Sequence, residues 1–201
     1  CSKAHSFDSD GFTCGSSTDL APADTCVAWQ WKANGGTRTT FSEVGDNPAG
    51  GYQANTTAGF SIVKWTGEAS QDTVGHGLSE APTLVIAKVV STTSSPPVGG
   101  LAGSMDFTDY MYLDGTAAYT DSAAYWNDTA PTSSLISLGT GDSNISAQTM
   151  IAYAFHSVEG YSKVGSYEGN SNADGPFIYT GFKPAYVLVK RINDTRKWAI
   201  N

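Results

Sequence analysis

Large hydrophobic residues alternate with small or polar residues along several short segments of the chain. Residues 27–31 (Val-Ala-Trp-Gln-Trp) and 151–155 (Ile-Ala-Tyr-Ala-Phe) both place a large side chain at every second position. Successive side chains of a strand point to opposite faces of a sheet. The pattern therefore predicts two strands whose large residues face the core, with alanines behind them that let a second layer approach closely.

Two other runs are apolar almost throughout. Residues 83–90 and 186–192 are rich in β-branched side chains, which is typical of central strands covered on both faces. Residues 121–126 predict one short helical turn at most. Turn-forming residues separate the segments at a spacing of roughly 8–12 residues, which is typical of antiparallel sandwiches and barrels. They include Gly99-Gly100, Asp114-Gly115, Gly139-Thr140-Gly141 and Asp174-Gly175-Pro176.

The segments match each other in pairs, which indicates an internal repeat of about 100 residues, the size of a typical all-β sandwich unit. For example, residues 59–61 read Gly-Phe-Ser and residues 160–162 read Gly-Tyr-Ser. The matched pairs are 12–15 with 136–139, 25–31 with 149–155, 59–67 with 160–169, 75–78 with 179–182, and 82–88 with 184–190.

The phase of the repeat predicts how the chain is divided. We expect residues 1–33 to be the back half of a β-sandwich unit, 34–58 a linker, 59–158 a complete unit, and 159–201 the front half of a further unit. Because an isolated half would expose its apolar face and its sheet edges, the two halves are predicted to pair, within one chain or between neighbouring chains. A chain that starts inside a unit is also what we expect of a piece of a longer protein.

Composition and charge exclude several classes of partner. The chain of 201 residues has a net charge of -8, and 15% of its residues are charged. A nucleic-acid-binding protein needs a basic face, and anionic lipid attracts basic segments, so we expect neither partner. No apolar stretch approaches the roughly 18 residues of a membrane span. Asn-x-Ser/Thr triplets, which matter only on a eukaryotic secretory route, start at Asn55, Asn127, Asn144 and Asn193.

The cysteines leave two interpretations open. Cys14 and Cys26 fall on two segments predicted to be paired strands, so they are candidates for a disulfide in an oxidising environment. Their counterparts in the complete unit, Leu138 and Met150, are ordinary core residues. Buried free thiols therefore fit equally well.

Candidate metal-binding and catalytic residues are sparse. Asp8 and Asp10 precede Gly11 as in the start of a calcium loop, but an aspartate turn explains them better. His76 stands between two glycines without a nucleophile motif, which favours a turn histidine bonded to backbone. Glu68 and Glu168 recur at similar places, as surface residues of a repeat would, so paired carboxylates for glycoside hydrolysis are not expected. We predict no catalytic residues, no cofactor and no enzyme activity.

Aromatic residues near loops and strand ends are the better candidates for binding. Sugar-binding sandwiches stack pyranose rings on aromatic faces, and the alternative is that the same rings form a core face. The predicted glycan or receptor surface comprises Tyr110, Tyr112, Tyr119, Tyr125 and Trp126, with Tyr52 as a further exposed ring.

Seven stretches across most of the chain resemble repeats of marine bacteriophage structural proteins, including tail-fibre-like proteins. They are Phe7-Asp-Ser-Asp-Gly-Phe-Thr13, 27–33, 55–63, 73–78, 124–131, 158–163 and 173–177. The resemblance implies an all-β, antiparallel, jelly-roll or lectin-like β-sandwich and carries no catalytic motif. This chain departs from the pattern of those repeats at Cys14 and Cys26.

The sequence thus predicts a non-enzymatic phage structural protein of the tail or virion surface. We expect it to be located on the virion or outside the cell. Its partners would be further copies of itself, other virion proteins and host surface polysaccharide. Two alternatives remain: a carbohydrate-binding module of a secreted polysaccharide-active protein, and a self-assembling capsid decoration or surface filament protein with no ligand.

Overall fold

The computed structural model describes residues 4–7, 9–14, 30–45, 47–100 and 103–201. The chain divides into two compact units, Cys1–Trp31 and Lys32–Asn201. In the first unit β1 (Ala4–Phe7) and β2 (Phe12–Cys14) form an antiparallel pair. Most of the strand predicted at 27–31 lies outside the described residues, and Gln30 and Trp31 are not part of a strand.

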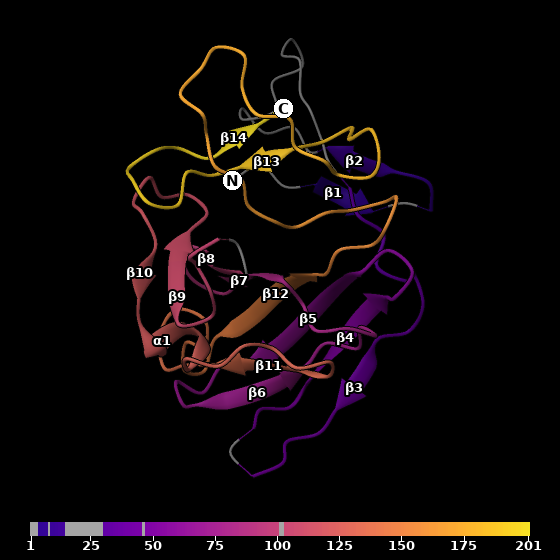
Figure 1. Cartoon of the computed structure of the whole chain (residues 1–201). Helices are drawn as coiled ribbons and strands as arrows, with labels where there is room; N and C mark the ends of the chain where they lie inside the picture. The colour runs from indigo at the N-terminus through magenta and orange to yellow at the C-terminus, as the bar shows by residue number, and fades with distance from the viewer. Residues whose placement is uncertain (1–3, 8, 15–29, 46, 101–102) are drawn as a thin grey trace. The chain divides into compact units, whose positions relative to one another are not determined.

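The second unit is built on an eight-stranded sheet whose neighbouring strands are all antiparallel (Figure 1). This arrangement confirms the prediction of an all-β antiparallel protein. In spatial order the strands are β10 (Thr120–Asp121), β9 (Asp109–Tyr112), β8 (Pro97–Gly100), β7 (Leu84–Val89), β12 (Thr149–Phe155), β5 (Phe60–Thr66), β4 (Gly50–Asn55) and β3 (Thr39–Phe41).

Strand β12 lies at the centre of this sheet. Its Ala152 is opposite Val63 of β5 on one side and opposite Ala87 of β7 on the other. The predicted strands at 151–155 and 83–90 are therefore confirmed, and both have neighbours on each side. Since β5 and β7 do not pair with each other, β12 is what connects the two halves of the sheet.

The predicted orientation of β12 is wrong. Its small face is the buried one: Ala152 and Ala154 are at most 1% exposed, whereas the large side chains of Ile151, Tyr153 and Phe155 are only half-buried. The same face of β12 also carries fully buried Met150, and Ile136 of the second layer lies in the same core. Alanines on β12 let that layer approach closely, so complementary sizes decide which face is buried.

The second layer consists of β6 (Asp72–Gly75) and β11 (Leu135–Leu138), which pair antiparallel. The main core lies between this pair and the eight-stranded sheet. The helix α1 (Ala123–Trp126) confirms the predicted turn at 121–126: the Ser122 hydroxyl accepts from the Ala124 amide, and Asn127 ends it with φ of 53°. No helix among the described residues is long and apolar enough to cross a membrane.

Two predictions about breaks in the sheet are wrong. Gly99-Gly100 lies within β8. A Cβ on Gly99 would come 2.5 Å from Nε1 of Trp126, so this glycine makes room for the indole within a strand. The expected linker at 34–58 contains β3 and β4, which complete the edge of the main sheet. Two of its glycines, Gly50 and Gly51, are close-packing positions: a Cβ on Gly50 would come 2.5 Å from the Lys64 carbonyl oxygen.

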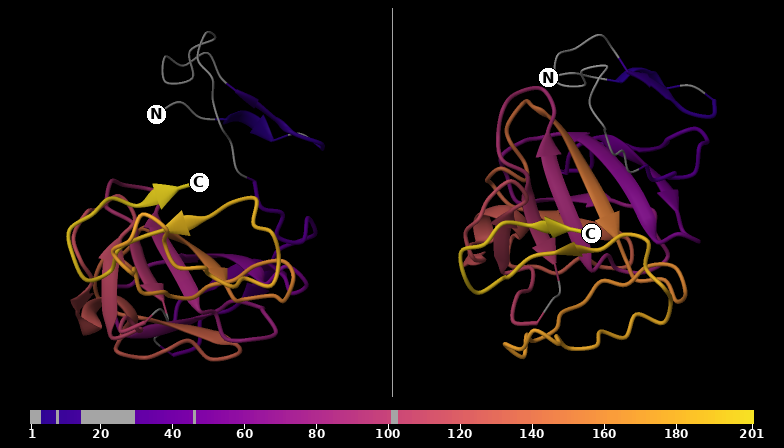
Figure 2. Two further views of the ribbon diagram at one scale, coloured as in Figure 1. Left: turned by 45° about the horizontal axis from the view of Figure 1, so that its top comes forward. Right: turned by 90° about the horizontal axis from the view of Figure 1, so that it is seen from above.

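The predicted front half of a sandwich, residues 159–201, contains two short strands in the described structure. They are β13 (Leu188–Val189) and β14 (Ala199–Ile200), which pair with each other. The central strand predicted at 186–192 is therefore wrong. Ile192 and Trp198 pack with Val98 and Met111 in a smaller core on the outer face of the sheet. Figures 1 and 2 show residues 160–201 on the face opposite β6 and β11.

A fully buried asparagine joins several segments around the main core. Asn144 Oδ1 accepts hydrogen bonds from Trp65 Nε1 at 3.0 Å and the Glu68 amide at 3.2 Å. Its Nδ2 donates to the Ser70 carbonyl at 3.1 Å and to an Asp72 carboxylate oxygen at 2.6 Å. The side-chain amide of Asn144 therefore makes two hydrogen bonds as acceptor and two as donor, with residues of β5, β6 and the loop between them.

We predict that Asn144→Ala lowers the free energy of unfolding by about 3 kcal/mol, because it leaves buried donors and acceptors without partners. Urea denaturation of the variant and the wild type measures the change. The control is Asn193→Ala, an exposed asparagine, for which we expect a change below about 0.5 kcal/mol. Equal effects of the two substitutions would show that the Asn144 hydrogen bonds add little.

Candidate interaction surface

Three of the five predicted glycan-surface residues form one cluster. The rings of Tyr110 and Tyr125 stack with centroids 3.6 Å apart, and Tyr112 meets Tyr125 edge-on at 6.1 Å. The Tyr112 hydroxyl lies 2.6 Å from that of Tyr125 and donates to Asp142 at 2.9 Å. Burial, with the hydrogen bonds, raises the pKa of Tyr125. The three rings contact one another, and the hydroxyls of Tyr112 and Tyr125 have hydrogen-bond partners. These contacts favour a structural role for the cluster.

The other two predicted residues lie elsewhere. Trp126 is fully buried and meets Phe107 edge-on at 5.9 Å, so its assignment to a surface is wrong. Its Nε1 has no hydrogen-bond partner among the described residues. Tyr119 packs against the smaller core, and its hydroxyl lies 3.1 Å from Ser104 Oγ. Sequence position alone could not separate these rings, because β9 and α1 bring only some of them together.

A shallow groove of about 420 Å³ lies between the β3 edge and the loop before β11. Phe41 and Tyr52 stack in its wall with centroids 6.5 Å apart. Exposed Leu135 and the hydroxyl side chains of Ser133 and Ser134 also line it. Of the aromatic residues predicted to bind a glycan, Tyr52 is thus the one that lines an open groove. Sugar sites combine an apolar surface of this kind with a few polar groups.

His76 is buried and bonded to backbone, as its sequence context predicted. Its Nδ1 accepts from the Leu78 amide at 3.1 Å, and its Nε2 lies 3.1 Å from the Thr132 carbonyl oxygen. These partners require a neutral ring with the proton on Nε2. Burial is the main cause that lowers the pKa of His76, and nearby His156 lowers it further. Among the described residues both ring nitrogens have backbone partners, and neither is bonded to the side chain of a nucleophile.

The remaining candidates form no site in the described structure. Asp10 is exposed, and its partner in the weak calcium motif, Asp8, lies outside the described residues. Cys26 also lies outside them, so the proposed disulfide with Cys14 stays a prediction. Glu68 and Glu168 are both exposed. Within the described residues no group of three or more His, Cys, Asp or Glu side chains could hold a metal ion.

The largest exposed apolar groups lie in the C-terminal segment that matched the front half of the repeat. Phe177 is 89% and Tyr179 is 79% exposed. Residues 177–184 line an open groove of about 350 Å³. We define residues 160–187 as the exposed segment; its other exposed apolar side chains are Tyr161, Tyr167, Ile178 and Val187.

A residue that matches this segment in the sequence is buried in the main sheet. Phe60 of β5 is 3% exposed, whereas Tyr161, its counterpart in the match of 59–67 with 160–169, is 59% exposed. The backbone differs in the same way: in the described structure no backbone-to-backbone hydrogen bond involves residues 165–185. The sequence pattern did not predict this surface, although the run Phe-Ile-Tyr at 177–179 was a signal for it.

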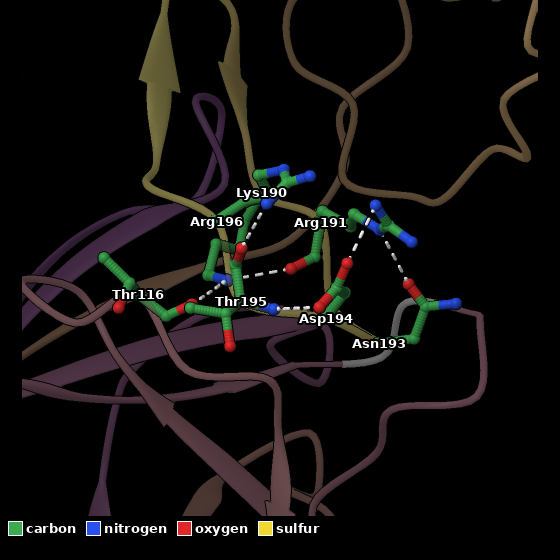
Figure 3. A network of polar contacts seen from close by, with 7 residues as sticks. All are labelled: Thr116, Lys190, Arg191, Asn193, Asp194, Thr195 and Arg196. Carbon is green, nitrogen blue, oxygen red and sulfur yellow. Dashed lines mark hydrogen bonds and ion pairs between the residues drawn. The ribbon is translucent and has the colours of Figure 1, made fainter.

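A network of polar contacts anchors the chain just after the exposed segment (Figure 3). The Thr116 carbonyl oxygen accepts from Lys190 Nζ at 3.1 Å and from the Arg196 amide at 2.8 Å. Arg191 pairs with Asp194 at 3.0 Å. The Thr195 amide, and then the charge of Arg191, lower the pKa of Asp194. The anchor holds residues 190–196 on the β9–β10 loop, so the exposed segment is tethered at its C-terminal end.

The fold and surface define an all-β protein with an antiparallel eight-stranded sheet, small accessory sheets and an exposed apolar segment. The chain belongs to a domain family of unknown function, DUF7483, whose family model matches residues 1–201. Neither the curated proteins nor the solved structures contain a match to this chain. The family has no named activity.

Buried His76 makes folding pH-dependent. The unfolded histidine titrates near its ordinary pKa of about 6.5, whereas the pKa of the folded one is lower. Its stabilising contribution is therefore fully present above about pH 6.5, and it is lost as pH falls toward the folded pKa, because the unfolded state binds the proton more readily. We predict that His76→Gln reduces the loss of thermal stability between pH 7.5 and 5. Calorimetry of the variant and the wild type at the two pH values measures this loss. A loss of the same size in the variant would contradict the contribution of His76 to the pH dependence.

Proposed function

We propose that this protein is a non-enzymatic structural protein of a phage tail or virion surface, which assembles with further copies of itself through β-structure. The observation that carries the proposal is the exposed segment 160–187, with Phe177 and Tyr179 almost fully exposed. Contiguous apolar surface of this kind marks interaction sites in soluble proteins. The resemblance to repeats of phage structural proteins supports the virion location.

The backbone of the exposed segment supports assembly by added strands. In the described structure no backbone-to-backbone hydrogen bond involves residues 165–185. In β-augmentation a main chain of this kind provides affinity, and alternate side chains provide specificity. A jelly-roll or lectin-like sandwich, completed by complementary halves of the repeat, is the arrangement we propose for the assembled form.

The test is the oligomeric state of the whole 201-residue chain. We predict concentration-dependent oligomers by size-exclusion chromatography with light scattering. Phe177→Ser combined with Tyr179→Ser should weaken self-association about tenfold or more, because truncating central aromatic residues of an interface costs more than about 1 kcal/mol each.

The matched control is Val90→Ser, which removes a 58% exposed side chain outside the exposed segment. It should leave self-association unchanged, and circular dichroism should show that all variants fold. A chain that stays monomeric at high micromolar concentration would contradict the proposal. So would a loss of association that is equal in the control.

The groove beside Phe41 and Tyr52 favours a second function, contact with host surface polysaccharide. An aromatic wall with adjacent hydroxyl and amide groups suits a pyranose ring. Because this groove and the exposed segment share no lining residue, both functions are compatible with one chain.

A glycan array tests the second function. Ser134→Arg places a long side chain at an exposed position of the groove, and it should abolish any binding that the wild type shows. The control is Ser146→Arg, at an exposed position that does not line the groove. Binding that survives Ser134→Arg would place the glycan elsewhere, and no binding by the wild type would remove this function.

A further inference from the structure

We propose that Asn34 is a site of spontaneous deamidation, at which the folded protein converts a side-chain amide to a carboxylate. Asn34 is the only asparagine of the chain that a glycine follows. It is exposed, in the stretch of the second unit that precedes β3. The inference goes beyond the proposed assembly and does not depend on it.

The reaction needs only groups of the chain and water. The Gly35 amide nitrogen gives up its proton and attacks the side-chain carbon Cγ of Asn34, and the side-chain nitrogen leaves as ammonia. Water then opens the resulting five-membered imide at either of its two carbonyl carbons. The product is an aspartate, or an isoaspartate whose main chain runs through the former side chain. No group is oxidised or reduced.

The hydrogen bonds around Asn34 favour this attack. The Gly36 amide donates to Asn34 Oδ1 at 2.9 Å, in the turn that asparagine side chains make with the backbone two residues on. Negative charge develops on Oδ1 when Cγ is attacked, and a donor at this distance stabilises it. The nucleophile, the Gly35 amide, has no hydrogen-bond partner among the described residues.

Glycine at position 35 leaves the approach to Asn34 open. It has no Cβ that would obstruct its nitrogen, and its φ of 72° is a conformation that glycine adopts without strain. Because the two reacting groups belong to neighbouring residues, the attack is intramolecular, which lowers its barrier.

Two other asparagines provide comparisons within the chain. Asn170 is also exposed, and its Oδ1 accepts from the amide two residues on at 3.1 Å, but Ser171 follows it. Asn144 is fully buried, and hydrogen bonds hold both ends of its side-chain amide. Of these three asparagines, Asn34 is the one that combines exposure with a glycine neighbour.

The modification falls in a stretch that β4 holds at two points. Asn55 Nδ2 donates to the Lys32 carbonyl at 3.2 Å. Gln53 Nε2 donates to the Gly36 carbonyl. An isoaspartate at position 34 lengthens the main chain between these two carbonyls by one carbon atom. We therefore expect that the two hydrogen bonds no longer fit together and that the stretch loosens from β4.

Peptide mass spectrometry tests the site on the whole 201-residue chain. The folded protein is incubated at about pH 8.5, digested with trypsin and compared with a sample digested at the start. We expect conversion at Asn34 to be about tenfold faster than at Asn170, or more, because glycine lowers the barrier to attack. Conversion should be slower at pH 6, since the Gly35 amide must lose its proton.

Two matched variants exchange the residue after the asparagine. Gly35→Ser should slow conversion at Asn34 to the rate of Asn170, and Ser171→Gly should raise the rate at Asn170 to that of Asn34. Serine fits at position 35, because Ser171 itself has φ of 55° and a Cβ on Gly35 would meet only the end of the Lys32 side chain. Circular dichroism checks that both variants fold.

Equal rates at Asn34 and Asn170 would overturn the site. So would conversion of Asn34 in urea but not in the folded chain, because the structure would then protect this position. The loosening has its own control, Asn34→Asp, which carries the new charge without the extra carbon atom. Chains converted to isoaspartate should exchange amide hydrogens over residues 33–38 faster than Asn34→Asp does. Equal exchange would overturn the loosening and leave the site itself intact.

Discussion

The main sheet depends on the insertion of β12 between β5 and β7. Residues 149–155 pair with β5, and residues 150–155 also pair with β7. Without this strand, β5 and β7 would each present an unpaired edge, and the alanine face that receives the second layer would be missing. The front part of the unit is thus not a complete sheet until a later part of the chain reaches it. Such long-range pairing must be specified by side-chain fit, which the small face of β12 provides.

The sequence predicted the class of fold and several strands, because period-two alternation and β-branched runs are local properties. It did not predict which face of β12 is buried, since that depends on the bulk of β6 and β11 across the core. Glycines were misleading for the same reason. Gly50 and Gly99 lie in strands at positions where a Cβ would clash with a neighbour, whereas composition suggests turns and a linker. Residues 186–192 have the composition of a central strand, but no such strand forms without neighbouring strands.

Buried polar groups were the least predictable part of the candidate site. Asn144 lies in an Asn-Ile-Ser triplet that reads as a surface glycosylation signal, yet it is fully buried with hydrogen bonds to β5, β6 and their loop. Its partners lie more than seventy positions away in sequence, so no local pattern reveals them. His76 was predictable because flanking glycines indicate a turn with nearby amides. The exposed segment was mispredicted in the opposite direction. A strongly apolar run suggests a core, but its side chains Phe177 and Tyr179 are exposed.

Electrostatics decides how such an apolar segment can be tolerated. A chain of net charge -8 repels its own copies, and this repulsion disfavours non-specific aggregation of exposed aromatic residues. Association then requires a local attraction that offsets the overall repulsion. The same apolar side chains on a neutral chain would instead associate with any exposed sheet edge.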